Sequence, residues 1–249
     1  MERLSSLQRR GVTPLRVIGL LGGMSWESSA LYYQIINREV QEKLGGVRSM
    51  PCNMYSYDFG EIEVLQKEGR WDEAGELLGN MAAGLEATGA DAIVLCTNTM
   101  HKVADHIEKR CKVPLLHIVD FTGEKIQDAG LQKIGLLGTR FTMTEGFYKQ
   151  RLVDRYGLDV LIPNDEDIEV VHRIIYDELV KGIIRDESRA EYIRIVNRLV
   201  DEGAQGIILG CTEIGSLLRP EDVENSQVFD TTELHAKGAA AWAMELALC

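Results

Sequence analysis

The chain contains the same short pattern twice, and this repeat constrains its fold more than any other feature. Residues 18–22, Ile-Gly-Leu-Leu-Gly, recur unchanged at residues 134–138. A second match follows in the same order, since Gly-Ala-Asp-Ala-Ile-Val-Leu at residues 89–95 aligns with Gly-Ala-Gln-Gly-Ile-Ile-Leu at residues 203–209. Two ordered matches predict two copies of one folding unit.

Short apolar runs rich in β-branched residues alternate with amphipathic stretches along the chain. This alternation is typical of parallel strands joined by crossover helices, and it predicts the α/β class. We expect strands at residues 17–22, 91–95, 115–118, 133–137 and 206–209. We expect helices between them at residues 29–44, 71–88, 147–156, 169–181 and 187–202.

The repeat and the alternation together predict two similar doubly wound lobes with parallel sheets, related by a pseudo-two-fold axis. The first lobe is expected to comprise residues 14–117 together with a C-terminal helix at residues 229–249, and the second lobe residues 118–228. Ligands of open parallel sheets bind beyond the carboxyl ends of the strands. The loops that follow the strands of both lobes should therefore face one cleft, which we expect to be the active site.

Charge and composition narrow the range of partners. The chain has 27 Lys and Arg against 39 Asp and Glu, a net charge of -12, which argues against nucleic acid and anionic membranes as partners. No apolar stretch is long enough to span a bilayer, and the N-terminus lacks the apolar core of a secretory signal. We expect a cytoplasmic protein with residues 1–14 as a frayed extension, and a small molecule as its partner.

The five cysteines lack CxxC spacing and are odd in number, so they indicate neither a disulfide framework nor a zinc site. The gapless alignment of the repeats places Thr97 opposite Cys211, and Cys96 opposite Gly210. A thiol at a strand exit and helix start should have a lowered pKa, so Cys211 is expected to form a thiolate. The remaining cysteines are expected to be small buried apolar residues.

The residues beside this predicted pair have two interpretations. Asn98, Thr99 and the amides of Thr212 and Glu213 resemble anion-binding helix starts, although such residues also serve as helix caps. The Gly22-Gly23 pair fits either a close approach of substrate to the backbone or a turn that only glycine can adopt. No GxGxxG or phosphate-binding loop is present, and two histidines five residues apart, at 101 and 106, do not share a helix face to bind a metal.

Three motifs carry a family resemblance. The segments 21–24 (Leu-Gly-Gly-Met), 97–101 (Thr-Asn-Thr-Met-His) and 210–213 (Gly-Cys-Thr-Glu) resemble the signatures of the aspartate/glutamate racemase family in order and spacing. The resemblance implies a two-lobed α/β fold, usually a homodimer, in which two facing cysteines interconvert amino-acid enantiomers without pyridoxal phosphate or metal. Here Thr97 replaces the first cysteine, which resembles the L-aspartate/glutamate-specific branch, as does Trp-Glu-Ser at residues 26–28.

The same resemblance implies a set of site residues. Thr97 and Cys211 form the catalytic pair, and the substrate site is lined by Met24, Gln66, Asn98, Thr99, Thr139, Thr142, Lys181, Thr212 and Glu213. Lys181 matches a lysine that meets the acidic side chain of the substrate, although it also reads as an exposed lysine that ends a helix. The arginine of aspartate-specific members has no counterpart in residues 58–65, which leaves room for glutamate or a broader range.

Racemisation needs one group to remove the α-proton and another to donate a proton to the opposite face. Thr is a far weaker acid than Cys, so Cys211 is expected to be the competent base, and L-enantiomers the favoured substrates. Three alternatives remain open: maleate isomerase or arylmalonate decarboxylase chemistry on the same fold, a broad-specificity amino-acid racemase, and a non-catalytic amino-acid binding protein.

Overall fold

A computed structural model describes residues 14–223 and 226–248 and contains two four-stranded parallel sheets. In the first sheet the order is β2 (Cys52–Ser56), β1 (Ile18–Gly22), β3 (Ala92–Leu95) and β4 (Leu115–Leu116). In the second it is β6 (Asp159–Leu161), β5 (Lys133–Gly138), β7 (Gly206–Gly210) and β8 (Gln227–Asp230). The predicted α/β class and the pair of parallel sheets are confirmed, and both sheets have the same strand order.

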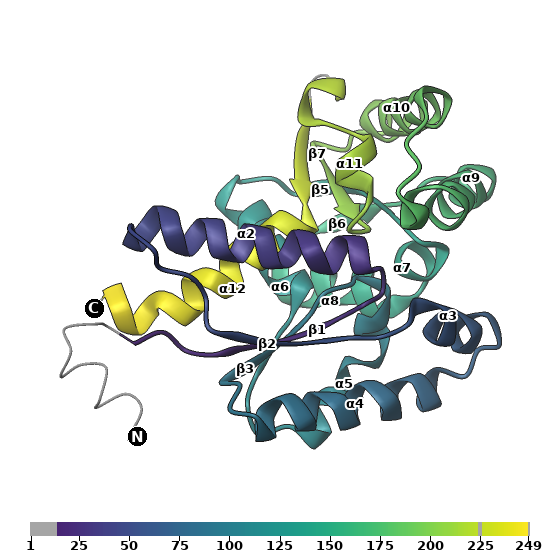
Figure 1. The fold of residues 1–249 in the computed structure, drawn as a ribbon. Helices are drawn as coiled ribbons and strands as arrows, with labels where there is room; N and C mark the ends of the chain where they lie inside the picture. The colour runs from purple at the N-terminus through teal and green to yellow at the C-terminus, as the bar shows by residue number, and fades with distance from the viewer. Residues whose placement is uncertain (1–13, 224–225, 249) are drawn as a thin grey trace.

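Helices cover both faces of each sheet (Figure 1). In the first half of the chain they are α2 (Trp26–Leu44), α3 (Phe59–Lys67), α4 (Trp71–Ala87), η1 (Thr99–Val103) and α5 (Ala104–Arg110). In the second half they are α6 (Ile118–Asp128), α7 (Arg140–Thr144), α8 (Gly146–Tyr156), α9 (Asp165–Asp177), η2 (Leu179–Lys181), α10 (Asp186–Asp201), α11 (Ile214–Leu217), η3 (Pro220–Asp222) and α12 (Thr231–Leu248).

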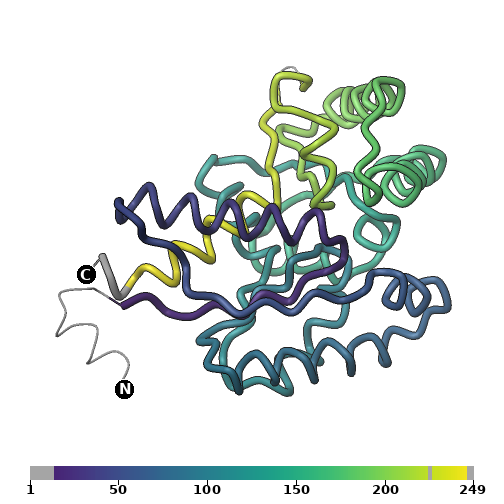
Figure 2. Tube along the Cα trace, in the orientation of Figure 1, coloured from purple at the N-terminus to yellow at the C-terminus, as the bar shows by residue number. Residues whose placement is uncertain are grey.

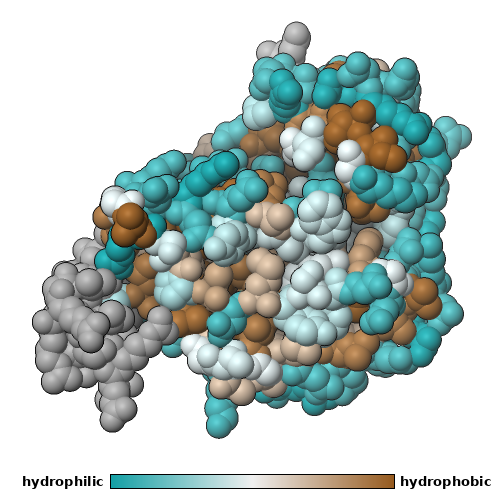
Figure 3. Space-filling model, in the orientation of Figure 1, coloured by the Kyte–Doolittle hydropathy of each residue, from teal (hydrophilic) through white to brown (hydrophobic). Residues whose placement is uncertain are grey.

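Alternate residues of the central strands divide the core into layers, as the two-residue period of a strand requires. In the first sheet Ile18 and Leu20 pack toward α2 and α12, whereas Leu21 packs toward α4. In the second sheet Leu137 belongs to a cluster with α9 and α10, and Leu136 to one with α6 and α8. Apolar residues on the face shown in Figure 3 form small separate groups among hydrophilic ones.

The repeat extends to backbone conformation and strand register. Gly89 and Gly203 precede β3 and β7 with φ of 95° and 100°, a region that L side chains rarely adopt. Across each sheet, Leu21 pairs with Leu95 and Leu137 pairs with Leu209. The two halves therefore enter and leave their central strands in the same way, so the residues that follow β3 and β7 occupy equivalent positions.

Several element boundaries differ from the predictions. The strand expected at 115–118 ends at Leu116, because the His117 ring accepts a hydrogen bond from the Val119 amide and caps α6. The helix expected at 169–181 starts at Asp165 and breaks at Glu178, beyond which η2 continues. The strands β2, β6 and β8 were not predicted, because they lie at or beside sheet edges and lack a continuous apolar run.

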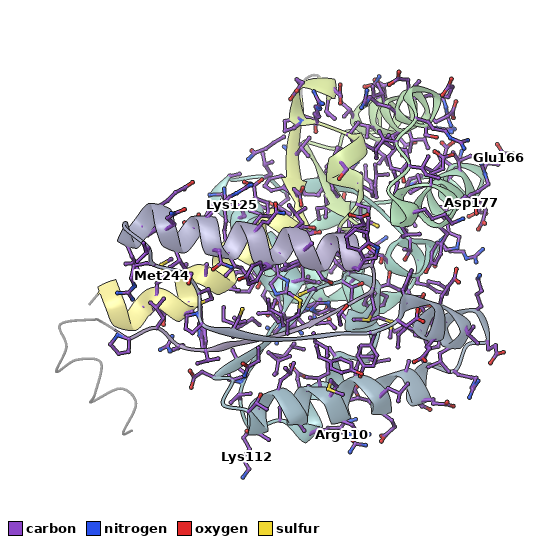
Figure 4. The ribbon with its side chains drawn as sticks, viewed as in Figure 1. Arg110, Lys112, Lys125, Glu166, Asp177 and Met244 are labelled. Atoms are coloured by element: carbon purple, nitrogen blue, oxygen red, sulfur yellow. The ribbon has the colours of Figure 1, made fainter. Side chains whose placement is uncertain are left out.

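The C-terminal helix α12 returns to the first half of the chain and packs against α2 and α6. Met244 lies between α12 and α2 (Figure 4), and the Arg16 amide donates to the Ala243 carbonyl at 3.1 Å. The Cα trace shows this helix beside the start of β1 (Figure 2). β8 extends to Asp230 in the second sheet, two residues past the predicted end of the second lobe.

The expectation for residues 1–13 and that for Cys249 lie outside the described residues. Within residues 14–223 and 226–248, no helix combines the length and the apolar character needed to cross a membrane.

Three buried histidines pack together where the chain crosses from the first sheet to the second. The His101 and His117 rings lie 4.5 Å apart, and His235 of α12 lies 6.0 Å from His101. His235 bonds to the Leu116 carbonyl at 2.7 Å and to the Tyr32 hydroxyl at 2.8 Å. Burial lowers the pKa of all three, to about 4 for His235 and about 2 for His117, so the cluster is neutral in the folded protein.

This cluster predicts that stability is lost in mild acid. Below pH 6.5 the histidines of the unfolded chain bind protons, whereas the buried histidines of the folded protein stay neutral. The free energy of unfolding is therefore retained above pH 6.5 and decreases toward pH 4. His235 alone should contribute a loss of about 3 kcal/mol in the free energy of unfolding over this range. Urea unfolding at several pH values should therefore show a shallower pH dependence for His235→Gln than for wild type; parallel curves would contradict the prediction.

Candidate active site

A pocket lies where the loops after the central strands of both sheets meet. Met24 follows β1, Thr97 follows β3, Thr139 follows β5 and Cys211 follows β7. The pocket spans about 340 Å³, open solvent included. Its wall contains these predicted site residues: Met24, Gln66, Thr97, Asn98, Thr99, Thr139, Cys211, Thr212 and Glu213. The structure thus brings together side chains that are far apart in the sequence.

Thr97 and Cys211 reach this pocket from opposite halves of the chain. Both are nearly buried, with 6% and 7% of their surface exposed. Cys96 instead points into the core between the first sheet and its α2 and α12 side, with its sulfur 3.7 Å from the Val94 carbonyl oxygen. Burial also raises the pKa of the Cys96 thiol. Thr97, and not Cys96, therefore occupies the position in the pocket that corresponds to Cys211.

Polar side chains from the two halves of the chain contact each other around the pocket. The Thr99 and Thr139 hydroxyls lie 2.9 Å apart, and the Tyr176 hydroxyl donates to Gln66 Oε1 at 2.9 Å. Thr142 stands behind this wall rather than in it, with its hydroxyl 3.2 Å from that of Thr139. Its predicted contact with substrate is therefore indirect here.

Asn98 lines the pocket and has one buried acceptor without a partner. Its Nδ2 donates to the Thr231 hydroxyl at 3.0 Å, which fixes the orientation of the amide. Its Oδ1 is buried without a hydrogen-bond partner. A buried carbonyl oxygen without a donor costs free energy, so a ligand that brings an N–H group to it gains the bond that the protein lacks.

Glu213 connects the thiol to the first half of the chain. Its Oε2 accepts hydrogen bonds from the Cys211 thiol at 3.1 Å and from the Thr212 hydroxyl at 2.6 Å. Its Oε1 accepts one from Ser25 at 2.6 Å. Ser25 was not among the predicted site residues; the only sequence signal for it is a serine at the start of α2, where its side chain accepts from the Ser28 amide.

The expected direction of the Cys211 pKa shift was wrong. Burial raises the pKa of this thiol well above its usual range, and the neighbouring Glu213 carboxylate raises it further. The amides of Glu213 and Ile214 act in the predicted direction, but they are outweighed. α11 is a single four-residue turn, and its start supplies too little positive potential to offset the loss of water around the sulfur.

Lys181 lies in an outer vestibule rather than in the pocket itself. This vestibule shares Gln66 and Tyr176 with the inner pocket, and it encloses about 1400 Å³, open solvent included. Its wall includes aromatic and charged residues: Glu63, Lys67, Trp71, Arg140, Phe141, His172, Arg173, Asp177 and Lys181. Asp177, labelled in Figure 4, marks its rim at the end of α9.

No sequence motif marks Tyr176, which lies on a helix of ordinary amphipathic pattern. It separates the inner pocket from the vestibule through its bond to Gln66, and its ring stacks on Phe59 at 6.4 Å. Only the folded chain brings these three side chains together.

The glycine pair after β1 serves turn geometry. Gly23 has φ of 91°, and a Cβ there would lie 2.2 Å from the backbone of Tyr57. A Cβ on Gly22 would lie 2.4 Å from the Ser29 hydroxyl. Neither glycine lines the pocket, so the turn interpretation fits the structure and the close approach of substrate does not. Across the described ranges, no group of three His, Cys, Asp or Glu side chains is arranged to hold a metal ion.

The family model for Asp/Glu/Hydantoin racemases matches residues 21–239, nearly the whole chain. The chain belongs to this family. Membership makes it an enzyme of the racemase type, an isomerase, and confirms the family resemblance seen in the sequence motifs.

Known proteins agree with this assignment. The chain is 52% identical to a candidate Asp/Glu racemase from Yersinia pestis, with a TM-score of 0.87 over 93% of this chain and 100% of the other. It is 35% identical to an aspartate racemase homologue from Pyrococcus horikoshii, with a TM-score of 0.78 over 93% and 100% of the two chains. It is also 25% identical to the broad specificity amino-acid racemase RacX of Bacillus subtilis, over 81% of this chain and 87% of that protein.

The burial of Cys96 in the core and of Cys211 in the pocket predicts an order of chemical reactivity. Without amino acid at neutral pH, iodoacetamide should modify the half-buried Cys52 and Cys111 before Cys211, whose pKa is raised, and before Cys96. Peptide mapping by mass spectrometry measures this order. Glu213→Gln should accelerate modification of Cys211, because it removes the charge beside the thiol; fastest labelling of Cys211 in the wild type would contradict the assignment.

Proposed function

We propose that the protein is a cofactor-independent amino-acid racemase that acts on aspartate and glutamate, with Thr97 and Cys211 on opposite faces of the substrate Cα. One observation carries this proposal: the two side chains occupy equivalent positions in the two halves and line the same pocket. A two-base racemase needs such an arrangement, because the proton leaves one face of Cα and arrives at the other.

The pocket supplies contacts for the groups common to all amino acids. Asn98 Oδ1, which lacks a donor, is suited to accept a hydrogen bond from the substrate ammonium. The Thr99 and Thr139 hydroxyls can turn toward a carboxylate instead of toward each other. They would also stabilise the negative charge that develops on that carboxylate as the α-proton leaves.

Substrate binding also activates the thiol. Burial and Glu213 favour the protonated thiol, whereas an ammonium group bound nearby would favour the thiolate. The amides of Glu213 and Ile214 add to that stabilisation. The Cys211 thiolate then removes the α-proton of an L-amino acid, and the Thr97 hydroxyl, or a water that it holds, donates a proton to the opposite face.

The vestibule favours an acidic side chain without restricting the pocket to one. Lys181, Arg140 and Arg173 contribute positive charge there, although Arg140 is paired with Glu169 at 2.8 Å. A side chain that extends past Gln66 and Tyr176 would meet these cations. The likeness to a broad specificity racemase supports a second candidate, in which neutral side chains are also accepted. Exchange assays with aspartate, glutamate and several neutral amino acids separate the two.

The catalytic assignment predicts different effects on activity when Cys211 and Cys96 are replaced. Cys211→Ser should abolish exchange of the Cα proton with D₂O, a loss of at least about 100-fold, because serine cannot serve as the base. Cys96→Ser is the matched control and should keep most activity, since Cys96 faces the core. Proton NMR of L-glutamate and L-aspartate measures both. Retained exchange in Cys211→Ser would refute the mechanism, and no exchange by wild type with any amino acid would indicate a binding protein.

The unequal pair also predicts a direction. Cys211 is expected to face the α-proton of L-substrates, so wild type should exchange the Cα proton of L-glutamate much faster than that of D-glutamate. Thr97→Cys should accelerate exchange from the D side and leave the L side nearly unchanged, because only the D-facing base gains acidity. The test is exchange without inversion, followed separately from each enantiomer by proton NMR. Equal wild-type rates, or no effect of Thr97→Cys on either, would overturn the asymmetric mechanism.

A further inference from the structure

We propose that Glu213 carries the proton between the Cys211 thiol and solvent, through a second hollow that is separate from the substrate pocket. This inference rests on the racemase activity proposed above. It starts from the position of the Glu213 carboxylate, which contacts the reacting sulfur directly at 3.1 Å.

The carboxylate is placed to receive a proton and not merely to fill space. It is buried, with 7% of the residue exposed, and every side chain that bonds to it does so as a thiol or hydroxyl donor. Thr212 and Ser25 hold its two oxygens from both sides at 2.6 Å. This fixes Oε2 toward Cys211, as a proton acceptor for the thiol requires.

The second hollow lies between α2 and the start of α11. It encloses about 580 Å³, open solvent included, and its wall consists of Glu27, Ser28, Ala30, Leu31, Gln34, Thr212, Glu213 and Ser216. Figure 1 shows α11 beside the N-terminal end of α2. The hollow and the substrate pocket have only Thr212 and Glu213 in common. Glu213 is therefore the one titratable residue that borders both spaces.

Catalysis creates a need for such a connection. Each conversion of an L-substrate leaves the abstracted proton on Cys211, and the bound amino acid fills the space through which water could reach the sulfur. The thiol S–H bond breaks as a new O–H bond forms on Glu213, which yields a thiolate and a neutral carboxylic acid. The acid then releases the proton to water in the hollow and returns to a carboxylate, so charge and atoms balance. The reverse sequence reprotonates the thiol.

A purely structural role for Glu213 makes a different prediction. If the carboxylate only held Cys211 in position, its loss would slow proton abstraction. The rates of label loss and of inversion would then fall in the same proportion. If it relays the proton, its loss would leave the abstracted proton on sulfur, from which it returns to the same Cα. The quantity that separates these roles is the ratio of label loss to inversion.

The experiment uses L-glutamate deuterated at Cα, incubated with the full-length protein in H₂O. Deuterium lost from the L-glutamate pool and D-glutamate formed are measured together by mass spectrometry after chiral separation. Glu213→Gln should lower the ratio of label loss to inversion by about tenfold or more. The same variant should make Cys211 more reactive to iodoacetamide, so a slower exchange cannot be ascribed to a damaged thiol.

Two further variants test the route. Glu27→Gln makes the same isosteric neutralisation in the wall of the hollow without touching the thiol, and it should leave the ratio unchanged. Ser216→Leu places a large side chain at an exposed position of the same wall, and it should lower the ratio while Cys211 and Glu213 stay intact. Circular dichroism confirms that each variant is folded, and if Glu213→Gln does not fold, Ser216→Leu still tests the proposal.

The outcomes separate this inference from the function on which it rests. Wild-type protein that removes no label from any amino acid overturns the racemase and the relay together. Label loss by wild type with an unchanged ratio in Glu213→Gln overturns the relay alone. A reduced ratio in Glu213→Gln with no effect of Ser216→Leu overturns the exit through the hollow, since the proton then leaves by the substrate pocket.

Discussion

The carboxyl ends of two parallel sheets meet in this protein, and hydrogen bonds between very short side chains hold the junction. Serine and threonine hydroxyls reach only a few ångströms from the backbone, so contacts such as Thr99 to Thr139 and Ser25 to Glu213 force the loops themselves close together. The chemistry of the site depends on how close these loops lie. Thr97 and Cys211 are nearly buried there, and charges among buried groups interact more strongly than they would in water.

Burial explains why the pKa of the Cys211 thiol lies well above its usual range. Burial disfavours the charged form of Cys211, and the histidines behind the site are kept neutral for the same reason. A ligand that carries both an ammonium and a carboxylate brings the missing charges with it. Under the proposed function, the substrate ammonium would favour the thiolate, so the reactive form of the sulfur would arise with substrate bound.

Much of this architecture could be predicted from the sequence because the chain repeats. Glycines at 89 and 203 fix the same turn before each central strand, so a gapless alignment was enough to place Thr97 opposite Cys211. The edge strands β2, β6 and β8 escaped prediction because their residues are not confined to one apolar pattern. Tyr176 and Ser25 escaped because their roles depend on partners in the other half of the chain, which no local pattern records. The direction of the Cys211 pKa was missed because burial depends on the whole enclosure, not on the helix that follows.

The contacts between Tyr176, Gln66 and Phe59 that separate the vestibule from the pocket are individually weak. A neutral hydrogen bond contributes about 1 kcal/mol net, and the stacking of Tyr176 on Phe59 adds a similar amount. Under the proposed function, an amino acid that moves from the vestibule into the pocket would have to displace contacts of only that strength.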